Sequence, residues 1–254
     1  MVAEALVLAA GLSTRLGALA RGAKFSVKVR SRPLISYPLT SLLLAGVEKI
    51  HIVVNPSGME RLEEVLASLG YVDVVDVVVN EEPWRENGYS LLVGASQLAT
   101  DSFFVSMSDH IYPIELPMRL REVAEMWEDA VIVVAGDRAP PYVDVEEATL
   151  IDAGGGLEVR RIGKSLRRWD FVDAGVFIMR KEVINVAREV ASEKDVVKLS
   201  DVVNAAVERG LKAVVADITG IPWTEVDTPK DYFLVNKGPR SIVVEEVVKG
   251  WSGR

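Results

Sequence analysis

The stretch Ala5-Leu6-Val7-Leu8-Ala9-Ala10-Gly11-Leu12-Ser13-Thr14-Arg15-Leu16 decides how this chain folds. It opens with apolar residues that suit a strand buried on both faces, and it continues with small residues that let a backbone approach a ligand closely. Arg15 then supplies one cation, and Lys24 a second one nine residues later. Such a loop can turn successive N–H groups toward a polyphosphate while the cations neutralise its charge. The stretch therefore predicts an anion-binding loop at the end of a buried strand.

The rest of the chain alternates short β-branched segments with longer amphipathic ones. We expect strands at 6–8, 50–54, 74–79, 103–106, 130–134, 171–179 and 213–218. We expect helices at 33–45, 59–69, 89–99, 116–127, 181–190, 200–208 and 229–235, the first opened by Pro33 and the second capped by Ser57. This repetition predicts an α/β fold with a mainly parallel, doubly wound sheet. Two short segments at 149–152 and 157–162, on either side of three glycines, predict a small antiparallel elaboration.

Length and composition fit one ordinary globular domain. The chain has 254 residues, of which 49% are hydrophobic and 26% charged, with no linker or repeat, so we expect a single domain over 1–254. Residues 241–254 read as a C-terminal helix or tail. No apolar stretch reaches the roughly 18 residues of a membrane span, and no secretory signal opens the chain, so we expect a cytoplasmic protein.

Charge and residue usage exclude several function classes. The formal net charge is -8, which argues against general nucleic-acid binding. The chain has no Cys and two His, so we expect any bound metal to have oxygen ligands. The absence of Cys and the scarcity of Gln fit a thermophilic source. Two basic clusters, Arg15 to Arg32 and Arg160 to Arg168, predict two places that receive anionic groups, although solvated surface charge is the plainer interpretation.

Two aspartates stand where an open α/β sheet places its ligand groups. Asp109 closes the strand predicted at 103–106, and Asp227 precedes the helix predicted at 229–235. Carboxylates there can hold Mg²⁺, whereas an isolated Asp227 could simply cap its helix. His110 reads as a packed or hydrogen-bonded neighbour of Asp109 and not as a ligand.

Two familiar phosphate-binding motifs do not fit the first loop. A Walker A motif needs Lys directly after its second glycine, but Gly22 is followed by Ala23 and only then by Lys24. A dinucleotide fingerprint needs three closely spaced glycines, and the loop offers Gly11 alone before Gly17. A dinucleotide-dependent oxidoreductase is therefore a remote alternative.

The loop resembles the signature of the nucleotidyltransferase superfamily, the pyrophosphorylase-like enzymes. Leu8-Ala9-Ala10-Gly11, Ser13, Arg15-Leu16 and Lys24 carry the resemblance, and Trp223 with Val226-Asp227-Thr228-Pro229 resembles the second metal aspartate of that superfamily. The matches run in order from residue 6 to about residue 231. Ser13 stands where many sugar nucleotidyltransferases have Gly, and Ala23 where Pro usually precedes the lysine. The resemblance implies a Rossmann-like three-layer α/β/α sandwich with a mainly parallel mixed sheet.

Within the superfamily the chain is most similar to CTP:inositol-1-phosphate cytidylyltransferases. Glu86-Asn87-Gly88-Tyr89-Ser90 resembles the segment that borders the cytosine in inositol-1-phosphate and phosphocholine cytidylyltransferases, although Asn87 and Ser90 could merely cap a helix. Gly163-Lys164-Ser165 with Asp173-Ala174-Gly175 resembles the acceptor side of the inositol-phosphate enzymes. The resemblance implies a nucleotide site at Leu8, Ala10, Gly11, Leu12, Ser13, Thr14, Arg15, Lys24, Asn80, Asn87, Gly88 and Ser90. It implies an acceptor site at Lys164 and Asp173, catalytic roles for Arg15, Lys24, Asp109 and Asp227, and Mg²⁺ held by Asp109 and Asp227.

The expected activity is transfer of CMP from CTP to inositol 1-phosphate, giving CDP-inositol and pyrophosphate, a step toward inositol-phosphate osmolytes or lipids. The chain resembles the free-standing form of these enzymes, which would supply a separate membrane synthase. Alternatives remain open: a sugar 1-phosphate or phosphocholine acceptor, the latter favoured by Trp169 and Phe171 through cation–π contact, or a catalytically silent regulatory homologue. The oligomeric state is not predicted.

Overall fold

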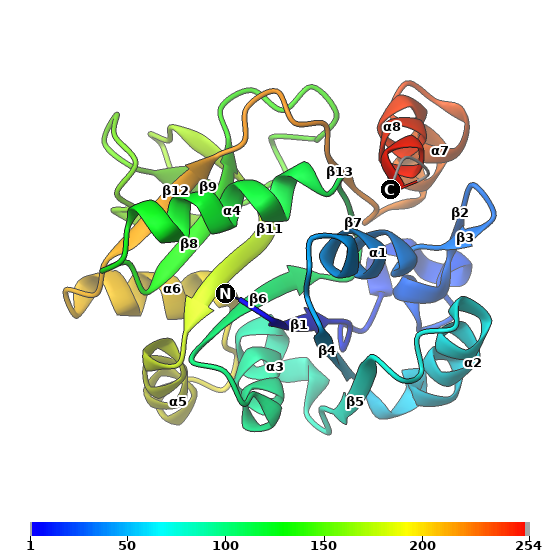
Figure 1. The fold of residues 1–254 in the computed structure, drawn as a ribbon, viewed down its shortest axis with the longest axis horizontal. Coiled ribbons are helices and arrows are strands. Elements are labelled where there is room, and N and C mark those ends of the chain that lie inside the picture. The colour runs from blue at the N-terminus through cyan, green and yellow to red at the C-terminus, as the bar shows by residue number, and fades with distance from the viewer. Residues whose placement is uncertain (1, 252–254) are drawn as a thin grey trace.

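The computed structural model describes residues 2–251 and is built around one large mixed sheet (Figure 1). Within these residues the sheet has nine strands in which β5, β4, β1 and β6 lie side by side in parallel. Strand β11 runs antiparallel to β6 and then pairs with both β8 and β9, which carry β12 and β10 on their far edges. The strands are β1 (Glu4–Leu8), β4 (Lys49–Val54), β5 (Val75–Val79), β6 (Ser102–Met107), β8 (Ile132–Asp137), β9 (Leu150–Asp152), β10 (Arg161–Gly163), β11 (Phe171–Arg180) and β12 (Ala213–Asp217).

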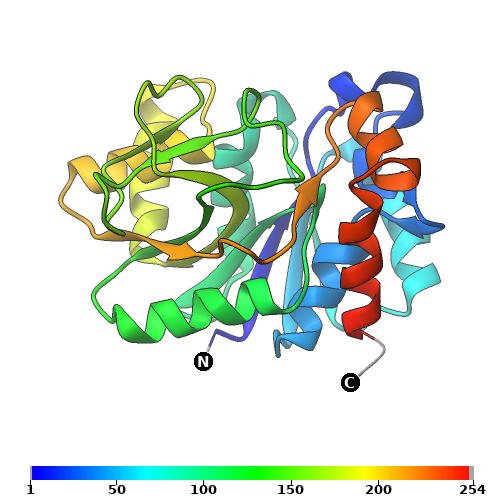
Figure 2. The same ribbon diagram turned by 90° about the horizontal axis from the view of Figure 1, so that it is seen from above.

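Helices cover both faces of this sheet, as the alternating side chains of β1 require. Ala5 and Val7 pack with the core on the side of α1, α2 and α4, while Leu6 and Leu8 pack with the core of α3, α5 and α6. Figure 2 shows α4 in green on one side and the yellow helices α5 and α6 on the other. The helices are α1 (Ser36–Leu44), α2 (Met59–Leu69), α3 (Glu86–Gly94), α4 (Glu115–Met126), α5 (Glu182–Glu193) and α6 (Leu199–Glu208). The predicted α/β/α sandwich with its antiparallel elaboration is confirmed.

A third apolar cluster lies beside the sheet and joins the segment after the first loop to the last two helices. Helices α7 (Pro229–Lys237) and α8 (Ser241–Trp251) pack with α1 and with the 3₁₀ helix Thr14–Leu19 through Leu16, Tyr37, Val235 and Val244. Two short ribbons complete the fold: β2 (Lys28–Val29) with β3 (Arg32–Pro33), and β7 (His110–Ile111) with β13 (Thr224–Glu225). Residues 252–254 of the expected C-terminal segment lie outside the described residues. Within residues 2–251, no helix combines the length and apolarity that crossing a membrane requires.

One predicted helix start, at Pro33, and one predicted helix cap, Ser57, are wrong for local reasons, whereas the predicted start of α2 (Met59–Leu69) is confirmed. Pro33 pairs in the β2–β3 ribbon, and α1 begins three residues later with Pro38 in its first turn, where a missing N–H costs no bond. Ser57 lies inside an extra 3₁₀ turn, Pro56–Gly58, whose cap is Asn55: the Gly58 N–H donates to Asn55 Oδ1 at 2.9 Å. The capping residue is therefore Asn55, which lies two residues before the predicted Ser57.

Two further boundaries differ from the sequence expectation. Helix α3 begins at Glu86 and not at Tyr89, and a 3₁₀ turn, Ala95–Gln97, continues it. The strand expected at 157–162 is reduced to β10, because two left-handed glycines, Gly154 and Gly155, open a wide turn before it.

Candidate active site

One cavity of about 700 Å³ opens at the carboxyl ends of β1 and β6. Its lining joins the first loop to the residues after β6 and to the start of β11, three segments far apart in the sequence. The predicted site residues in its lining are Leu8, Ala10, Gly11, Leu12, Ser13, Thr14, Arg15, Lys24, Asn87, Ser90, Asp109, Lys164, Asp173 and Asp227. Asn80 and Gly88 do not line it.

The first loop is closed by hydrogen bonds at both ends. The Lys24 N–H donates to Ser13 Oγ at 2.9 Å, and Asn55 Nδ2 donates to the Ala10 carbonyl at 3.1 Å. Ser13 has a left-handed backbone with φ 58°, a conformation that glycine adopts without strain. The hydrogen bond from Lys24 to the Ser13 hydroxyl brings Lys24 back to the loop.

Four charged side chains meet at the centre of the cavity. The Lys24 ammonium contacts both Asp109 Oδ2 and Asp227 Oδ1, and Arg15 contacts Asp227 Oδ2 at 2.6 Å. The Lys24 side chain is 19% exposed and that of Asp109 is 8% exposed. Burial disfavours charge on Lys24, but the two carboxylates outweigh it and raise the pKa of Lys24. Burial likewise opposes charge on Asp109, but Lys24 and His110 lower its pKa. Lys24 and Asp109 are therefore both charged at neutral pH.

The β7–β13 ribbon brings the two aspartates together (Figure 1). His110 pairs with Glu225 in this ribbon, and the Val226 N–H donates to the Asp109 carbonyl at 3.1 Å. The cap of α7 is Thr228, whose hydroxyl accepts from the Asp231 N–H. The interpretation of Asp227 as a simple helix cap is therefore wrong, and its carboxylate faces the cavity.

The residues at this centre fit a magnesium ion. Mg²⁺ is commonly held by one or two carboxylates, with waters and substrate phosphates completing an octahedral shell. Asp109 and Asp227 already share one cationic partner, Lys24, so their oxygens point to a common place. Among residues 2–251 there is no cluster of three His, Cys, Asp or Glu side chains able to cage a metal ion. This donor set suits an ion that arrives with a phosphate.

His110 lines the cavity, but acidic side chains face both of its ring nitrogens, so it is not a free base. Its Nδ1 lies 2.7 Å from Asp109 Oδ1, its Nε2 lies 3.5 Å from Glu225 Oε2, and its ring stacks on Trp223. Burial opposes charge on the ring, but Asp109 outweighs it and raises the pKa of His110 to about 9. The expected role of His110 as a hydrogen-bonded neighbour agrees with these contacts, whereas Glu225 was not predicted.

Helix α3 forms the cavity wall that we predicted to border the nucleotide base. Asn87 Oδ1 accepts from the Leu199 N–H at 2.8 Å, which ties α3 to the start of α6, and Ser90 Oγ accepts from buried Asn80 at 3.0 Å. Neither side chain caps α3, so the helix-cap alternative is wrong. Gly88 packs so closely on Lys198 that a Cβ would lie 2.7 Å from its backbone. Asn80 and Gly88 therefore support the wall of the cavity from behind.

The opposite wall carries the two residues assigned to the acceptor. Lys164 Nζ donates to the Glu147 carbonyl at 2.8 Å, and Asp173 Oδ1 accepts from the Gly175 N–H at 2.8 Å. Burial raises the pKa of Asp173 to about 7. Of the second basic cluster, Lys164 alone lines the cavity, and Trp169 and Phe171 do not.

Sequence reasoning missed several lining residues because no motif marks them. Trp84 lies at the cavity wall with 51% of its surface exposed, an unusual state for a large aromatic residue. The start of α6 adds Lys198 and Ser200. Trp84 stands three residues before the predicted Asn87, and this proximity is the one signal that the sequence offered.

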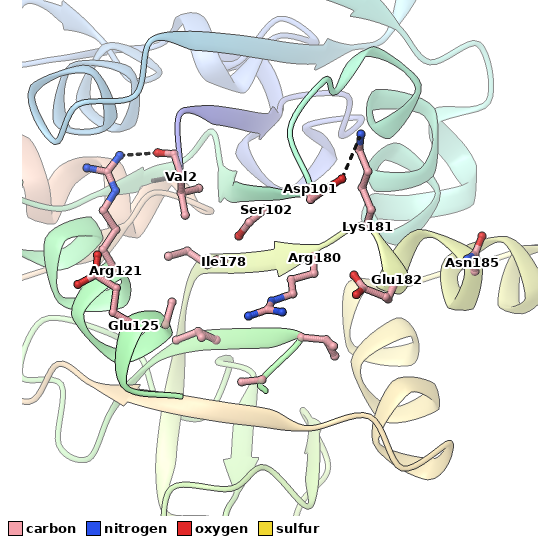
Figure 3. A pocket seen from close by; sticks show the side chains of 14 residues that line it. Val2, Asp101, Ser102, Arg121, Glu125, Ile178, Arg180, Lys181, Glu182 and Asn185 are labelled. Carbon is pink, nitrogen blue, oxygen red and sulfur yellow. Dashed lines mark hydrogen bonds and ion pairs between the residues drawn. The ribbon is translucent and has the colours of Figure 1, made fainter. Parts of the chain in front are cut away.

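A second cavity of about 680 Å³ lies at the other end of the sheet (Figure 3). It is lined by acids and bases in equal measure, and Figure 3 shows Arg121 hydrogen-bonded to the carbonyl of Val2 and Lys181 paired with Asp101. None of the predicted site residues belongs to it. Cationic side chains of this cavity form hydrogen bonds to nearby backbone carbonyls. The Lys181 ammonium, for example, donates to the Ala99 carbonyl at 3.0 Å.

Comparisons with known proteins agree with this geometry. Residues 5–170 match the family model of the MobA-like NTP transferase domain. The chain is 33% identical over 98% of its length to a bifunctional IPC transferase and DIPP synthase of Thermococcus kodakarensis, and 30% identical over 98% to that of Aquifex aeolicus. It covers 53% and 54% of those proteins, so it spans about half of their length. The solved inositol-1-phosphate CTP transferase from T. maritima superposes with a TM-score of 0.84 at 27% identity, covering 96% of each chain.

Proposed function

Because this chain belongs to the MobA-like NTP transferase family, we propose that it is a Mg²⁺-dependent cytidylyltransferase that acts on inositol 1-phosphate. The products are CDP-inositol and pyrophosphate. One observation carries the proposal: Lys24 joins Asp109 and Asp227 in a cavity whose far wall holds Lys164 and Asp173. The similar structure from T. maritima, which is that of an inositol-1-phosphate CTP transferase, supports CTP as donor and inositol 1-phosphate as acceptor.

The donor half of the cavity is suited to a nucleoside triphosphate. Arg15 and the amides of the first loop hold the β- and γ-phosphates, because exposed N–H groups and a guanidinium both bind phosphate oxygens well. Lys24 neutralises charge on the α-phosphoryl group and on the leaving oxygen. Asn87 and Ser90 border the base. A fixed cation at a position where charge develops contributes about 3 kcal/mol to lowering the barrier.

The reaction is one in-line displacement without a covalent enzyme intermediate. An oxygen of the acceptor phosphate forms a bond to the α-phosphorus, and the bond from that phosphorus to the β-phosphate oxygen breaks, so that pyrophosphate leaves with the electron pair. A phosphate oxygen is already nucleophilic at neutral pH, so no general base is needed. The protein's main task is to position two anions and offset their repulsion. Lys164 neutralises the acceptor phosphate, and Asp173 receives a hydroxyl group.

The two aspartates would hold the metal ion. When bound, Mg²⁺ supplies positive charge that polarises the α-phosphoryl oxygens. Asp109 and Asp227 bring that charge to the junction of the donor and acceptor halves, since both line the same cavity.

An acceptor with hydroxyl groups fits better than phosphocholine. A quaternary ammonium group is usually bound by aromatic rings. Trp169 and Phe171, the rings that could have formed such a cage, lie outside the lining. The wall beside Lys164 instead offers the carboxyl groups of Asp173 and Glu225, which accept hydrogen bonds from a polyol.

The test is a panel of acceptors with one donor. Purified protein with Mg²⁺ and CTP is incubated with inositol 1-phosphate, phosphocholine or glucose 1-phosphate, and pyrophosphate release and product mass are measured. We expect CDP-inositol from the first acceptor and loss of release on chelation of Mg²⁺. Activity with another acceptor alone would overturn the acceptor assignment but keep the roles of Lys24 and the aspartates. No release with any acceptor would favour a silent regulatory homologue.

The two curated relatives combine the transferase with a DIPP synthase in one protein, as their names state. We propose that the product of this chain likewise serves such a synthase. Addition of the chain's product to membranes that contain the synthase tests this step through consumption of the nucleotide-linked inositol.

A further inference from the structure

His110 touches an acidic side chain with each of its two ring nitrogens. Nδ1 lies 2.7 Å from Asp109 Oδ1, and Nε2 lies 3.5 Å from Glu225 Oε2. The other oxygen of Asp109 contacts Lys24. One imidazole therefore contacts a proposed metal ligand on one side and an acid of the acceptor wall on the other.

The ring is fixed in this orientation by its surroundings. It stacks on Trp223 with 5.9 Å between ring centroids and 7° between planes, and Trp223 Nε1 donates to buried Asp137 at 3.0 Å. On its other side lies Gly175, where a Cβ would come within 2.6 Å of His110 Nε2. Gly175 also has φ +68°, which side chains rarely adopt. A ring held this firmly can set the position of both acids that it contacts.

Glu225 is well placed to meet the acceptor. It lines the cavity together with Asp173, its side chain is 19% exposed, and within residues 2–251 its carboxylate forms no ion pair other than the one with His110. The pairing of Glu225 with His110 in the β7–β13 ribbon sets this contact. The carboxylate therefore retains acceptor capacity for a hydroxyl group of the substrate.

We propose that His110 is a positioning residue that holds Asp109 for the metal through Nδ1 and holds Glu225 for a hydroxyl group of the acceptor through Nε2. The Glu225 half rests on the proposed function, because it assumes a phosphorylated polyol. The Asp109 half concerns metal binding alone. Loss of a group that orients a metal ligand typically weakens metal affinity by about 10- to 100-fold.

Two substitutions separate the two contacts. The amide nitrogen of Asn falls near the place of Nδ1, and that of Gln near the place of Nε2, so His110→Asn keeps the bond to Asp109 and His110→Gln keeps the contact with Glu225. Mn²⁺ binding to the protein without nucleotide is measured by electron paramagnetic resonance. We expect roughly tenfold weaker Mn²⁺ binding for His110→Gln and a change of less than about twofold for His110→Asn.

Kinetics with inositol 1-phosphate test the second contact. We expect His110→Asn and Glu225→Gln to raise KM for inositol 1-phosphate by about tenfold with a smaller change in kcat. His110→Asn loses the contact that holds Glu225, and Glu225→Gln replaces a charged hydrogen-bond acceptor by a weaker, neutral one. Glu225→Gln should leave Mn²⁺ binding within about twofold. His51→Asn is the matched control, since His51 is a buried histidine beside an acid, Glu4, at the other end of the sheet, and it should change neither quantity.

The outcomes separate this proposal from the proposed function. Equal effects of His110→Asn and His110→Gln on Mn²⁺ binding, or no effect of His110→Gln, overturn the role of Nδ1. An unchanged KM in Glu225→Gln overturns the role of Nε2 even if His110 variants fold poorly. A wild-type protein that releases no pyrophosphate contradicts the proposed function, yet its Mn²⁺ binding still decides the Asp109 half.

Discussion

Cavities of nearly equal size lie at opposite ends of the central sheet, and their charged side chains are used differently. At the amino end of the parallel strands, cations donate to backbone carbonyls: Arg121 to those of Ala45 and Val2, and Lys181 to that of Ala99. At the carboxyl end, Lys24 and Arg15 pair with carboxylates from distant segments. The cations at the amino end stabilise the backbone of the fold, whereas those at the carboxyl end surround the cavity of the candidate active site.

The partners of the charged side chains therefore distinguish a structural role from a candidate catalytic one. The volumes of the two cavities do not make this distinction. A cation that satisfies carbonyl groups stabilises local structure. Two buried carboxylates next to each other repel, so an arrangement that keeps both Asp109 and Asp227 at one place requires a cation. Such a requirement is typical of a site built for a ligand.

The largest expected effect is on turnover when the central cation is removed. Lys24→Ala should lower kcat by about 10²- to 10³-fold, because charge on the α-phosphoryl group loses its fixed partner. Pyrophosphate release measures it. Arg180→Ala, in the second cavity, is the control and should keep kcat within about twofold. Comparable losses in both variants would remove the distinction between the two cavities.

A pair of aspartates four residues apart sharpens the same contrast. Asp227→Asn should lower kcat by about 10²-fold with little change in stability, because it loses a proposed metal ligand. Asp231→Asn should instead lower the free energy of unfolding by about 1–2 kcal/mol, since Asp231 completes the cap of α7 and pairs with Arg240 at 2.7 Å. Urea unfolding and pyrophosphate release on both variants check this division, and a reversed pattern would contradict it.

Asp173 should give the protein a pH-dependent stability. Burial raises its pKa from 3.8 to about 7 in the folded state, so between these values the folded protein binds a proton that the unfolded chain does not. This group therefore lowers the free energy of unfolding as pH rises from about 4 to about 7, by up to a few kcal/mol. Asp173→Asn should remove that decline, as measured by urea unfolding at pH 5 and pH 8. An unchanged slope in the variant would place the carboxyl group in a more polar environment.

The smallest effect on turnover is expected at the amino end of the sheet. Arg121→Met should lower the free energy of unfolding by about 2 kcal/mol, because two carbonyl groups lose a charged hydrogen-bond donor. Turnover should stay within about twofold of wild type, since Arg121 lies away from the cavity that holds Lys24. A large loss of turnover in a stable variant would show that the second cavity also matters for catalysis.

The sequence predicted most of the fold because its signals are local. Four of the five residues of strand β1, Ala5 to Leu8, are apolar, and such a run between helical segments indicates a buried parallel strand. The errors arose where two local signals compete. Pro33 and Pro38 both suit a helix start, and only the pairing of Pro33 in the β2–β3 ribbon decides between them.

The candidate site was predicted in part for the same reason. Asp109 and Asp227 follow strands and stand in recognisable motifs, so their placement in one cavity was foreseen. Glu225 was missed although it stands two residues before Asp227, because its contact with His110 depends on the register of the β7–β13 ribbon. Asn80 and Gly88 were assigned to the nucleotide, but their bonds to Ser90 and to the backbone at Val197 place them behind the wall.

The sequence by itself determined the order of strands and helices, the first loop and the charged residues that the motifs contain. These follow from side-chain period, backbone preference and the chemistry of single residues. Tertiary structure alone decided that Lys24 meets two aspartates, that Arg121 donates to the carbonyl groups of Ala45 and Val2, and that His110 stands between Asp109 and Glu225. The physical reason is that distances between segments far apart in the chain are set by how the whole sheet packs, and hydrogen bonds and ion pairs act only over a few ångströms.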